Sequence, residues 1–469
     1  MIAPMNGTLL IRNISYLVTC DDADRILRDV SVLIVDGVIR LICADEAMAE
    51  RLPECGVPDP AAIPTIDARG HALYPGLVNT HHHFYQIFSR NLPEVQRLEL
   101  FPWLKALYQI WKKLNPEVVY LSSLCGMGEL LKCGCTTSTD HHYVFPSGHG
   151  MDLMDAQFSA AAQLGMRFHA TRGSMDLSEK DGGLPPDSVV QTIDAILRDS
   201  EEAVRRFHDP APFAMRRVAL APCSPFSVSR ALLSESAGLA RKLGVRLHTH
   251  LAETKDEERY MLEKEGVRPL AYMEQLGWMG EDVWYAHGIH FNDEELSLLA
   301  RTQTGVAHCP VSNMKLSSGI ARVPEMLRMN IPVGLAVDGS ASNDGSNLLE
   351  EMRVCYLLHR LNASADALSG YDVLKIATRG GARLLGREEI GQIAEGRAAD
   401  CFLIDLCRPE LVGAQFDPAA MLATVGFKGP VDYTVVDGKV VVEKGRLTGI
   451  DERQTARRAN EACRKYLFE

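Results

Sequence analysis

Histidine and acidic side chains gather at the ends of four short apolar runs in this 469-residue sequence. They are His81, His82, His83, His250, Glu253, His287 and Asp338. Successive residues of an extended strand point to opposite sides, so His81 and His83 share one side and His82 faces the other. Imidazole nitrogens together with carboxylate oxygens suit a zinc ion that keeps one position open for water. The pattern therefore predicts a metal site with an exchangeable water.

Two further histidines lie near this set. His248 shares the side of His250 but lies one layer deeper, so we expect it to pack or to support a ligand. His308 ends another apolar run, and the sequence leaves open whether it belongs to a substrate loop or to the structure. A single histidine at a strand end is usually structural, but four such ends together favour a functional site.

Eight short β-rich runs alternate with longer segments of helical character. The runs are 76–79, 136–139, 166–171, 218–221, 245–249, 283–286, 305–307 and 333–337. Asn115-Pro116, and Asn292 with acidic residues after it, are typical helix starts. This α/β alternation predicts a (β/α)8 TIM barrel, in which function concentrates at the carboxyl ends of the strands. A doubly wound open sheet would alternate in the same way, but no glycine-rich dinucleotide motif follows the first strand.

Both ends of the chain contain hairpin patterns. Residues 31–43 turn at Asp36-Gly37, and residues 431–443 turn at Asp437-Gly438. These distant segments predict one small β domain assembled from both ends, with an amphipathic helix over 451–467. The expected parts are residues 1–72 (small domain), 73–392 (catalytic barrel) and 393–469 (small domain and C-terminal helix).

The composition excludes several classes of protein. The net charge of -12, without a basic patch, argues against a nucleic-acid partner. No apolar run reaches the roughly 18 residues of a membrane span, and Met1–Asn6 lacks the layout of a secretory signal. The 12 cysteines include no CxxC pair, so we expect free thiols in a reducing compartment. The sequence therefore predicts a soluble cytoplasmic protein with a small-molecule substrate.

Three motifs resemble the signatures of the amidohydrolase superfamily: Pro75–His83, His250–Thr254 and Val337–Gly339. Within it, the chain looks most like the 8-oxoguanine deaminases. The segments that carry this closer resemblance are 101–105, 140–143, 171–175, 181–186, 221–226 and 339–344. A neighbouring group that hydrolyses hydroxylated s-triazines is similar in many of the same places.

The resemblance implies a β-sandwich beside the barrel and a homo-oligomer. It also implies one Zn²⁺, with Fe²⁺ as the alternative, held by His81, His83, His250 and Asp338. Asp338 would also take a proton from water, Glu253 would protonate the ring and the leaving amine, and His287 would hydrogen-bond the developing oxyanion. Binuclear members bridge two metals with a lysine on strand four. Residues 220–223 contain none, which favours one metal.

These features lead us to expect an aminohydrolase of cyclic amidines that converts 8-oxoguanine and water to urate and ammonia. Hydrolysis of hydroxylated N-alkyl triazines or of isocytosine stays an alternative, because those rings share the same reacting unit. A non-catalytic scaffold would lack ligands, and this chain lacks none. Guanine deaminases resemble this layout but carry an arginine on strand four that holds the purine. No basic residue lies between Val218 and Arg230 here, so the comparison implies that guanine should fit less well. Gln86, Trp103 and Arg172 are the candidate substrate contacts.

Overall fold

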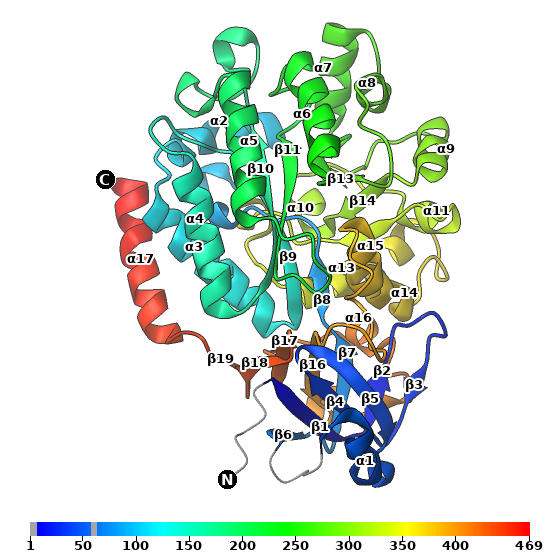
Figure 1. The fold of residues 1–469 in the computed structure, drawn as a ribbon. Helices are drawn as coiled ribbons and strands as arrows, with labels where there is room; N and C mark the ends of the chain where they lie inside the picture. Colours follow the sequence, from blue (N-terminus) through cyan, green and yellow to red (C-terminus); the bar gives the residue numbers. More distant parts are fainter. Residues whose placement is uncertain (1–6, 58–62) are drawn as a thin grey trace.

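The structure, a computed structural model, describes residues 7–57 and 63–469. Figure 1 shows a barrel surrounded by helices, with a smaller β domain below it that contains segments from both ends of the chain. Residues 1–6, on which the expectation about a secretory signal depends, lie outside the described residues. Within the described residues, no helix is long and apolar enough to cross a membrane.

Eight parallel strands form the barrel, in the order β8 to β15. They are β8 (Leu77–Asn79), β9 (Cys135–His142), β10 (Arg167–Ser174), β11 (Arg216–Pro222), β12 (Leu247–Leu251), β13 (Val283–His287), β14 (Gly305–His308) and β15 (Val333–Leu335). The amide of Thr80 donates to the carbonyl of Leu335 (3.2 Å), which joins the first strand to the last. All eight predicted strands are present, and the predicted TIM barrel is confirmed.

The strands alternate with helices, most of which cover the outside of the barrel (Figure 1). They include α2 (Leu100–Trp111), α3 (Pro116–Lys132), α4 (Met151–Leu164), α5 (Ile193–Phe207), α6 (Arg230–Leu243), α7 (Lys255–Glu265), α8 (Pro269–Gln275), α9 (Asp293–Thr302), α10 (Pro310–Lys315), α11 (Val323–Arg328), α12 (Ser340–Asn343), α13 (Leu348–Asn362), α14 (Gly370–Lys375) and α15 (Gly381–Leu384). The Asn115 side chain accepts from the amide of Val118 (3.1 Å), and Asn292 forms a capping box with Glu295. The two helix starts predicted from these asparagines are therefore confirmed.

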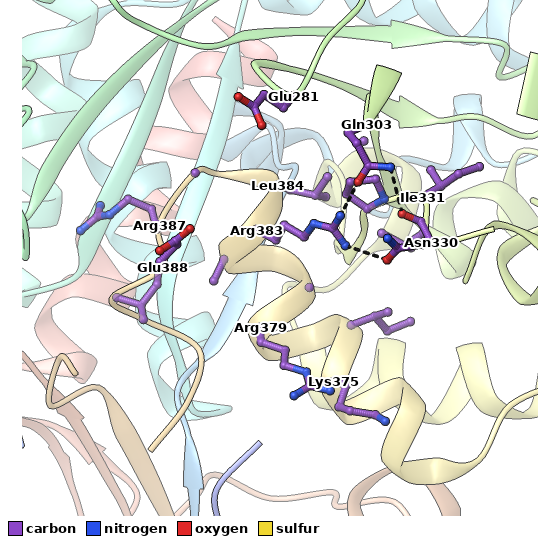
Figure 2. A pocket seen from close by; sticks show the side chains of 18 of the residues that line it. Glu281, Gln303, Asn330, Ile331, Lys375, Arg379, Arg383, Leu384, Arg387 and Glu388 are labelled. Carbon is purple, nitrogen blue, oxygen red and sulfur yellow. Dashed lines mark hydrogen bonds between the residues drawn. The ribbon is translucent and has the colours of Figure 1, made fainter. Parts of the chain in front are cut away.

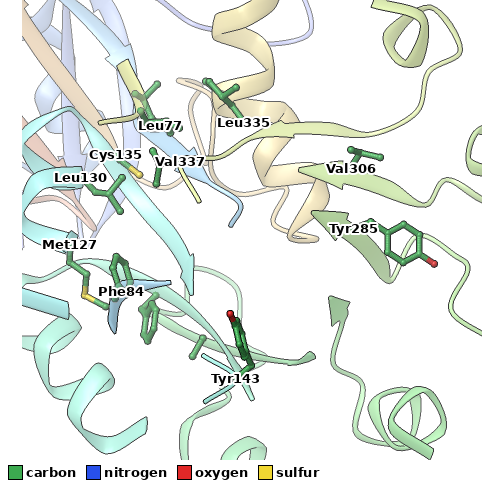
Figure 3. Packing of buried hydrophobic residues seen from close by; sticks show 14 of the residues in the cluster. Leu77, Phe84, Met127, Leu130, Cys135, Tyr143, Tyr285, Val306, Leu335 and Val337 are labelled. Atoms are coloured by element: carbon green, nitrogen blue, oxygen red, sulfur yellow. The ribbon is translucent and has the colours of Figure 1, made fainter. Parts of the chain in front are cut away.

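Alternating strand residues separate the barrel interior from the layer beneath the helices. Tyr285 and Val306 pack in the large cluster between strands and helices, as Figure 3 shows. Their neighbours Trp284 and Ala307 belong to a different cluster, inside the barrel. Because side chains alternate along a strand, the position of a residue in the strand decides whether its side chain faces the barrel interior or the helices.

The small domain is a sandwich of two sheets. One sheet has the order β5-β4-β1-β6 and the other β19-β18-β17-β16-β7-β2-β3. The strands are β1 (Thr8–Ile14), β2 (Tyr16–Val18), β3 (Ile26–Leu27), β4 (Val30–Val35), β5 (Val38–Ala44), β6 (Thr65–Asp67), β7 (His71–Pro75), β16 (Cys401–Asp405), β17 (Tyr433–Val436), β18 (Lys439–Glu443) and β19 (Arg446–Leu447). Both predicted hairpins are present, and β7 pairs with β16 from the other end of the chain.

The boundary expected at residue 72 falls within β7, so the small domain's sheet extends to Pro75. The helix α1 (Asp45–Arg51) follows the N-terminal hairpin. The C-terminal helix α17 (Glu452–Phe468) packs against α3, close to the range predicted for it. Short segment α16 (Met421–Thr424) contacts α13 and α14.

Candidate metal centre and active site

Four potential ligand atoms converge at the carboxyl ends of the barrel strands. Nε2 of His83 lies 3.2 Å from Nε2 of His250. Oδ1 of Asp338 lies 3.3 Å from Nε2 of both His81 and His83. Neighbouring ligand atoms of a zinc ion, each about 2.0–2.2 Å from it, lie roughly 3.0–3.4 Å apart. The three distances given above match this spacing, and each of the four predicted ligands takes part in at least one of them.

The other ring nitrogen of each histidine is anchored. Nδ1 of His83 donates to the carbonyl of His141, and Nδ1 of His250 donates to the carbonyl of Cys223, both at 2.7 Å. Each Nδ1 thus carries the proton, which leaves the lone pair of Nε2 facing the centre.

His81 is anchored through a second imidazole. Nδ1 of His248 donates to the carbonyl of Trp284 (2.9 Å), so Nε2 of His248 accepts from Nδ1 of His81 (2.7 Å). His248 therefore supports a ligand, as the sequence predicted, and does not join the ligand set. The facing atom, Nε2 of His81, is buried and has no hydrogen-bond partner.

The protonation states also suit a metal. Burial holds the pKa of His81 and of His250 well below the usual value of a histidine. Both imidazoles are therefore neutral, which is the form that binds a metal ion. A divalent zinc or iron ion fits this set of donors. The set comprises the Nε2 lone pairs of His83 and His250, the unpartnered Nε2 of His81 and the carboxylate of Asp338.

Asp338 is held by its neighbours. The hydroxyl of Ser312 donates to Oδ2 at 2.6 Å, and the hydroxyl of Ser342 donates to the same oxygen at 3.2 Å. The amide of Gly339 donates to Oδ1 (2.7 Å). These bonds fix the carboxylate so that Oδ1 faces the histidines.

Glu253 and His287 face each other beside the ligands. Oε2 of Glu253 lies 3.5 Å from Nε2 of His287, and both side chains are buried. Burial raises the pKa of Glu253 well above that of an ordinary glutamate, and the nearby charges of Asp338 and Glu257 add to the effect. The carboxyl group therefore holds a proton in the pH range where most glutamates have lost theirs.

The backbone is strained at three points of this site. Ala252, His287 and Asp338 have φ angles of 54°, 77° and 63°, in the left-handed region that favours glycine. Such conformations cost about 1–3 kcal/mol each and persist where the surroundings enforce them. All three residues belong to, or adjoin, the ends of barrel strands that carry the polar side chains.

A small pocket lies over the ligand atoms. Its walls are His83, Gln86, Leu100, Trp103, Leu104, Tyr143, Cys223, Phe226, His250, Glu253, His287, Leu316, Asp338 and Ser342. The structure thus places two predicted substrate contacts, Gln86 and Trp103, in the pocket wall. Oε1 of Gln86 and Nε1 of Trp103 are buried without a hydrogen-bond partner. No lysine or arginine lines this pocket.

The structure places Arg172, the third predicted substrate contact, outside this pocket. Strand β10 continues to Ser174, and Arg172 points toward the helices rather than into the barrel. Its guanidinium donates to Gln191 (2.7 Å) and to Asp199 (3.2 Å), and it lies over the ring of Phe145. These partners hold the guanidinium on the helix side of β10, away from the pocket where the sequence led us to expect it.

Other residues of the site carried no role in the sequence analysis. His141 lies among the ligand histidines, and Tyr143 and Cys223 line the pocket. His141 and Tyr143 belong to the segment 140–143 that carried the closer resemblance, which was the available signal. His308, left open from the sequence, lies outside this pocket: its Nε2 is 3.2 Å from Nε2 of His359, on the helix side of β14.

A larger cavity of about 840 Å³ lies at the opposite end of the barrel (Figure 2). Its walls include Val283, Gly305 and Val333, the first residues of their strands. Arg383 within it is already bonded to Gln303 and Asn330. No histidine lines this cavity, so the predicted ligand set lies at the other end of the barrel.

Comparison with known proteins agrees with this geometry. The profile of the amidohydrolase family matches residues 72–441. The chain belongs to the amidohydrolase family. Hydroxydechloroatrazine ethylaminohydrolase of Pseudomonas sp. (strain ADP) is 43% identical over 98% of this chain and 96% of its own. The 8-oxoguanine deaminase of Pseudomonas aeruginosa is 44% identical over 89% of this chain and 92% of its own.

A solved structure extends the comparison to the fold. Atrazine chlorohydrolase of Arthrobacter aurescens TC1, complexed with zinc, has a TM-score of 0.91 and 33% identity, covering 97% of this chain and all (100%) of that chain. The chain is therefore a hydrolase of this family that acts on C–N bonds in cyclic compounds. Its reaction is that of a hydrolytic deaminase or amidohydrolase of heterocycles. The predicted resemblance and the predicted enzyme class are confirmed.

Proposed function

We propose that this amidohydrolase is a mononuclear zinc enzyme that deaminates 8-oxoguanine to urate and ammonia. The observation that carries the hydrolytic part is the convergence of three histidine Nε2 atoms and Asp338 Oδ1 beside a buried Glu253 whose pKa is raised. Strand β11 ends in Leu220, Ala221 and Pro222 and offers no lysine to bridge a second metal ion.

The residues divide the chemistry between them. A bound divalent metal would lower the pKa of water to about 7 and so make a nucleophile available at neutral pH. Asp338 would accept a proton from the attacking water. Glu253 would donate its proton to the ring nitrogen next to the amino-bearing carbon, and then carry a proton to the leaving ammonia. His287 would donate a hydrogen bond to the oxygen as negative charge develops on it.

The pocket wall supports an uncharged, ring-shaped substrate. Without a lysine or arginine it has no partner for a phosphate or carboxylate group. Trp103 offers an aromatic surface and an unpaired N–H donor, and Gln86 offers an unpaired amide oxygen. A flat heterocycle with both donors and acceptors on its edge would satisfy them.

Substrate entry requires some movement of the wall. The cavity at the metal centre encloses about 30 Å³, and one water needs at least roughly 10–15 Å³. A purine needs considerably more, so binding would displace apolar side chains of α2, which supplies Leu100, Trp103 and Leu104.

Hydrolysis of a hydroxylated N-alkyl triazine is the second candidate. It is supported by the 43% identity to hydroxydechloroatrazine ethylaminohydrolase, which extends over nearly the whole chain. The same ligands and the same Glu253 would serve that reaction, because the triazine carries the same N–C–N unit. The substrate is therefore distinguished by the pocket wall and not by the metal centre.

Steady-state kcat/KM of the zinc-loaded enzyme on four compounds tests the proposal. They are 8-oxoguanine, isocytosine, guanine and a hydroxylated N-ethyl triazine. An 8-oxo group replaces an acceptor at N7 with a donor, so guanine would leave buried partners unmatched at about 1–3 kcal/mol each. We expect 8-oxoguanine first, isocytosine second and guanine third. A triazine that exceeds all three would refute the substrate assignment and leave the hydrolytic mechanism standing.

A further inference from the structure

One short segment contacts all three proposed catalytic residues. It comprises α10 and the turn that follows, residues 310–318. Its Ser312 donates to Asp338 (2.6 Å), and its Ser318 donates to Oε1 of Glu253 (3.3 Å). Between them, the amide nitrogen of Asn313 lies 2.9 Å from Nδ1 of His287. This segment follows strand β14, whose terminal residue does not itself enter the pocket.

Asn313 is rigidly placed. The side chain is 1% exposed. The backbone N–H of Asn313 donates to the backbone carbonyl of Cys309 (3.0 Å). The backbone carbonyl of Asn313 accepts from the backbone N–H of Ser318 (2.9 Å). The residue therefore presents its side chain to His287 from a fixed turn of helix.

The contact determines where the imidazole carries its proton. An amide N–H can only donate, so the Nδ1 of His287 that faces it must accept. Nδ1 of His287 therefore carries no proton, and an imidazole with a free lone pair on Nδ1 has its proton on the other ring nitrogen. The proton then lies on Nε2, the nitrogen that faces Glu253 at 3.5 Å.

We propose that Asn313 is a positioning residue that holds His287 in the Nε2–H tautomer, so that the imidazole can donate to the oxygen attacking the substrate. Asn313 acts through His287 and does not line the pocket itself. The inference rests on the proposed function, because it assigns His287 the role of a donor. The opposite tautomer would present a lone pair to the developing negative charge and repel it.

Two substitutions of Asn313 separate this role from a structural one. Asn313→Asp keeps the shape but replaces the donor with an acceptor, which draws the proton to Nδ1. Asn313→Ala removes the partner and leaves both tautomers accessible. We expect kcat to fall about 10- to 100-fold in Asn313→Ala and further, by at least roughly 10³-fold, in Asn313→Asp. KM and zinc content should change little in either variant.

A purely structural role predicts the reverse order, because aspartate matches asparagine in shape whereas alanine leaves a cavity. Asn313→Asp that is as active as Asn313→Ala, or more active, would therefore overturn the proposal. Asn292→Asp is the matched control: Asn292 caps α9, a position where aspartate serves equally well, so its kcat should equal that of wild type.

A spectroscopic measurement tests the tautomer without any substrate. In zinc-loaded protein labelled with ¹⁵N-histidine, the His287 signals are identified by their loss in His287→Gln. We expect a protonated Nε2 in wild type and a protonated Nδ1 in Asn313→Asp. A wild-type His287 protonated on Nδ1 would refute the proposal even if neither variant folds. If no heterocycle is turned over, the proposed function fails while this readout still decides the role of Asn313.

Discussion

Oε2 of Glu253 lies 3.5 Å from Nε2 of His287, and neither side chain is accessible to solvent beyond a few per cent. The pair combines a carboxyl group whose pKa is raised by burial with an imidazole whose pKa burial lowers to about 4. One group can therefore give a proton while the other stabilises charge by a hydrogen bond. Two buried groups with pKa values displaced in opposite directions are typical of an acid–base site.

Glu253→Gln should keep the shape of this site and remove its exchangeable proton. We expect zinc content to remain at the wild-type level and kcat to fall by about 10²-fold or more. Steady-state kinetics with metal analysis of the same samples checks both expectations. Glu263→Gln, an exposed position on α7, is the control and should be fully active. A Glu253→Gln enzyme with near wild-type kcat would exclude Glu253 from the mechanism.

The activity should also depend on pH through Glu253. The pKa of this carboxyl is raised, so the group keeps its proton to higher pH than an ordinary glutamate and loses it as pH rises further. Because the protonated form donates, kcat/KM should decline as pH rises through that raised pKa. An amide does not titrate, so the residual activity of Glu253→Gln should lack this alkaline decline. The same decline in both enzymes would assign it to another group.

Metal content provides a separate test of the ligand set. We expect about one zinc per chain, as one set of His and carboxylate ligands with an open position implies. His250→Ala should lose the ion, because Nε2 of His250 is one of the converging atoms. His82→Ala should keep it, since Nε2 of His82 lies 3.0 Å from the hydroxyl of Ser346 instead. Two ions per chain, with activity proportional to both, would contradict the mononuclear assignment.

The ligands could be anticipated from the sequence because they depend on local periodicity. His81 and His83 are two residues apart, and a strand turns such residues to one side whatever the rest of the fold does. The same rule explains the position of Arg172. The sequence ended its strand at residue 171, but β10 runs to Ser174, and Arg172 shares the outward side of Ala170.

The supporting residues could not be anticipated in this way. Asn313 is 26 residues from His287 in the chain, and Ser318 is 65 residues from Glu253. Their contacts depend on how the loop after β14 folds over the barrel mouth, for which no short-range pattern exists. The carboxylate of Glu257 accepts hydrogen bonds from the backbone amides of Ala252 and Glu253 (2.8 and 2.9 Å). From the sequence, Glu257 looks like an ordinary acidic residue in the first turn of a helix.

His248 offers a test of support behind a ligand. His248→Phe should break the chain from Trp284 to His81 while keeping an aromatic ring in the barrel. Loss of such a partner weakens metal affinity by about 10- to 100-fold. Competition for zinc with a chromophoric chelator measures the change. His169→Phe is the control, because His169 is also buried in the barrel but its ring nitrogens have no hydrogen-bond partner. If the two variants bound zinc with equal affinity, His248 would not be a support for the ligand His81.

A buried ion pair connects the barrel to the sandwich domain. Arg167 at the start of β10 forms two hydrogen bonds with Asp400 (2.7 and 2.9 Å), and both side chains are fully buried. Asp400→Asn removes the nearest carboxylate from this buried guanidinium and leaves Asp437, at 3.5 Å, as its remaining ion-pair partner. We expect a cost of up to about 3–5 kcal/mol in the free energy of unfolding. The exposed pair of Arg205 and Glu202 is the control, since Glu202→Gln should cost at most about 1 kcal/mol. Urea unfolding of the two variants measures the difference. Equal stabilities would show that the buried pair does not hold the two domains together.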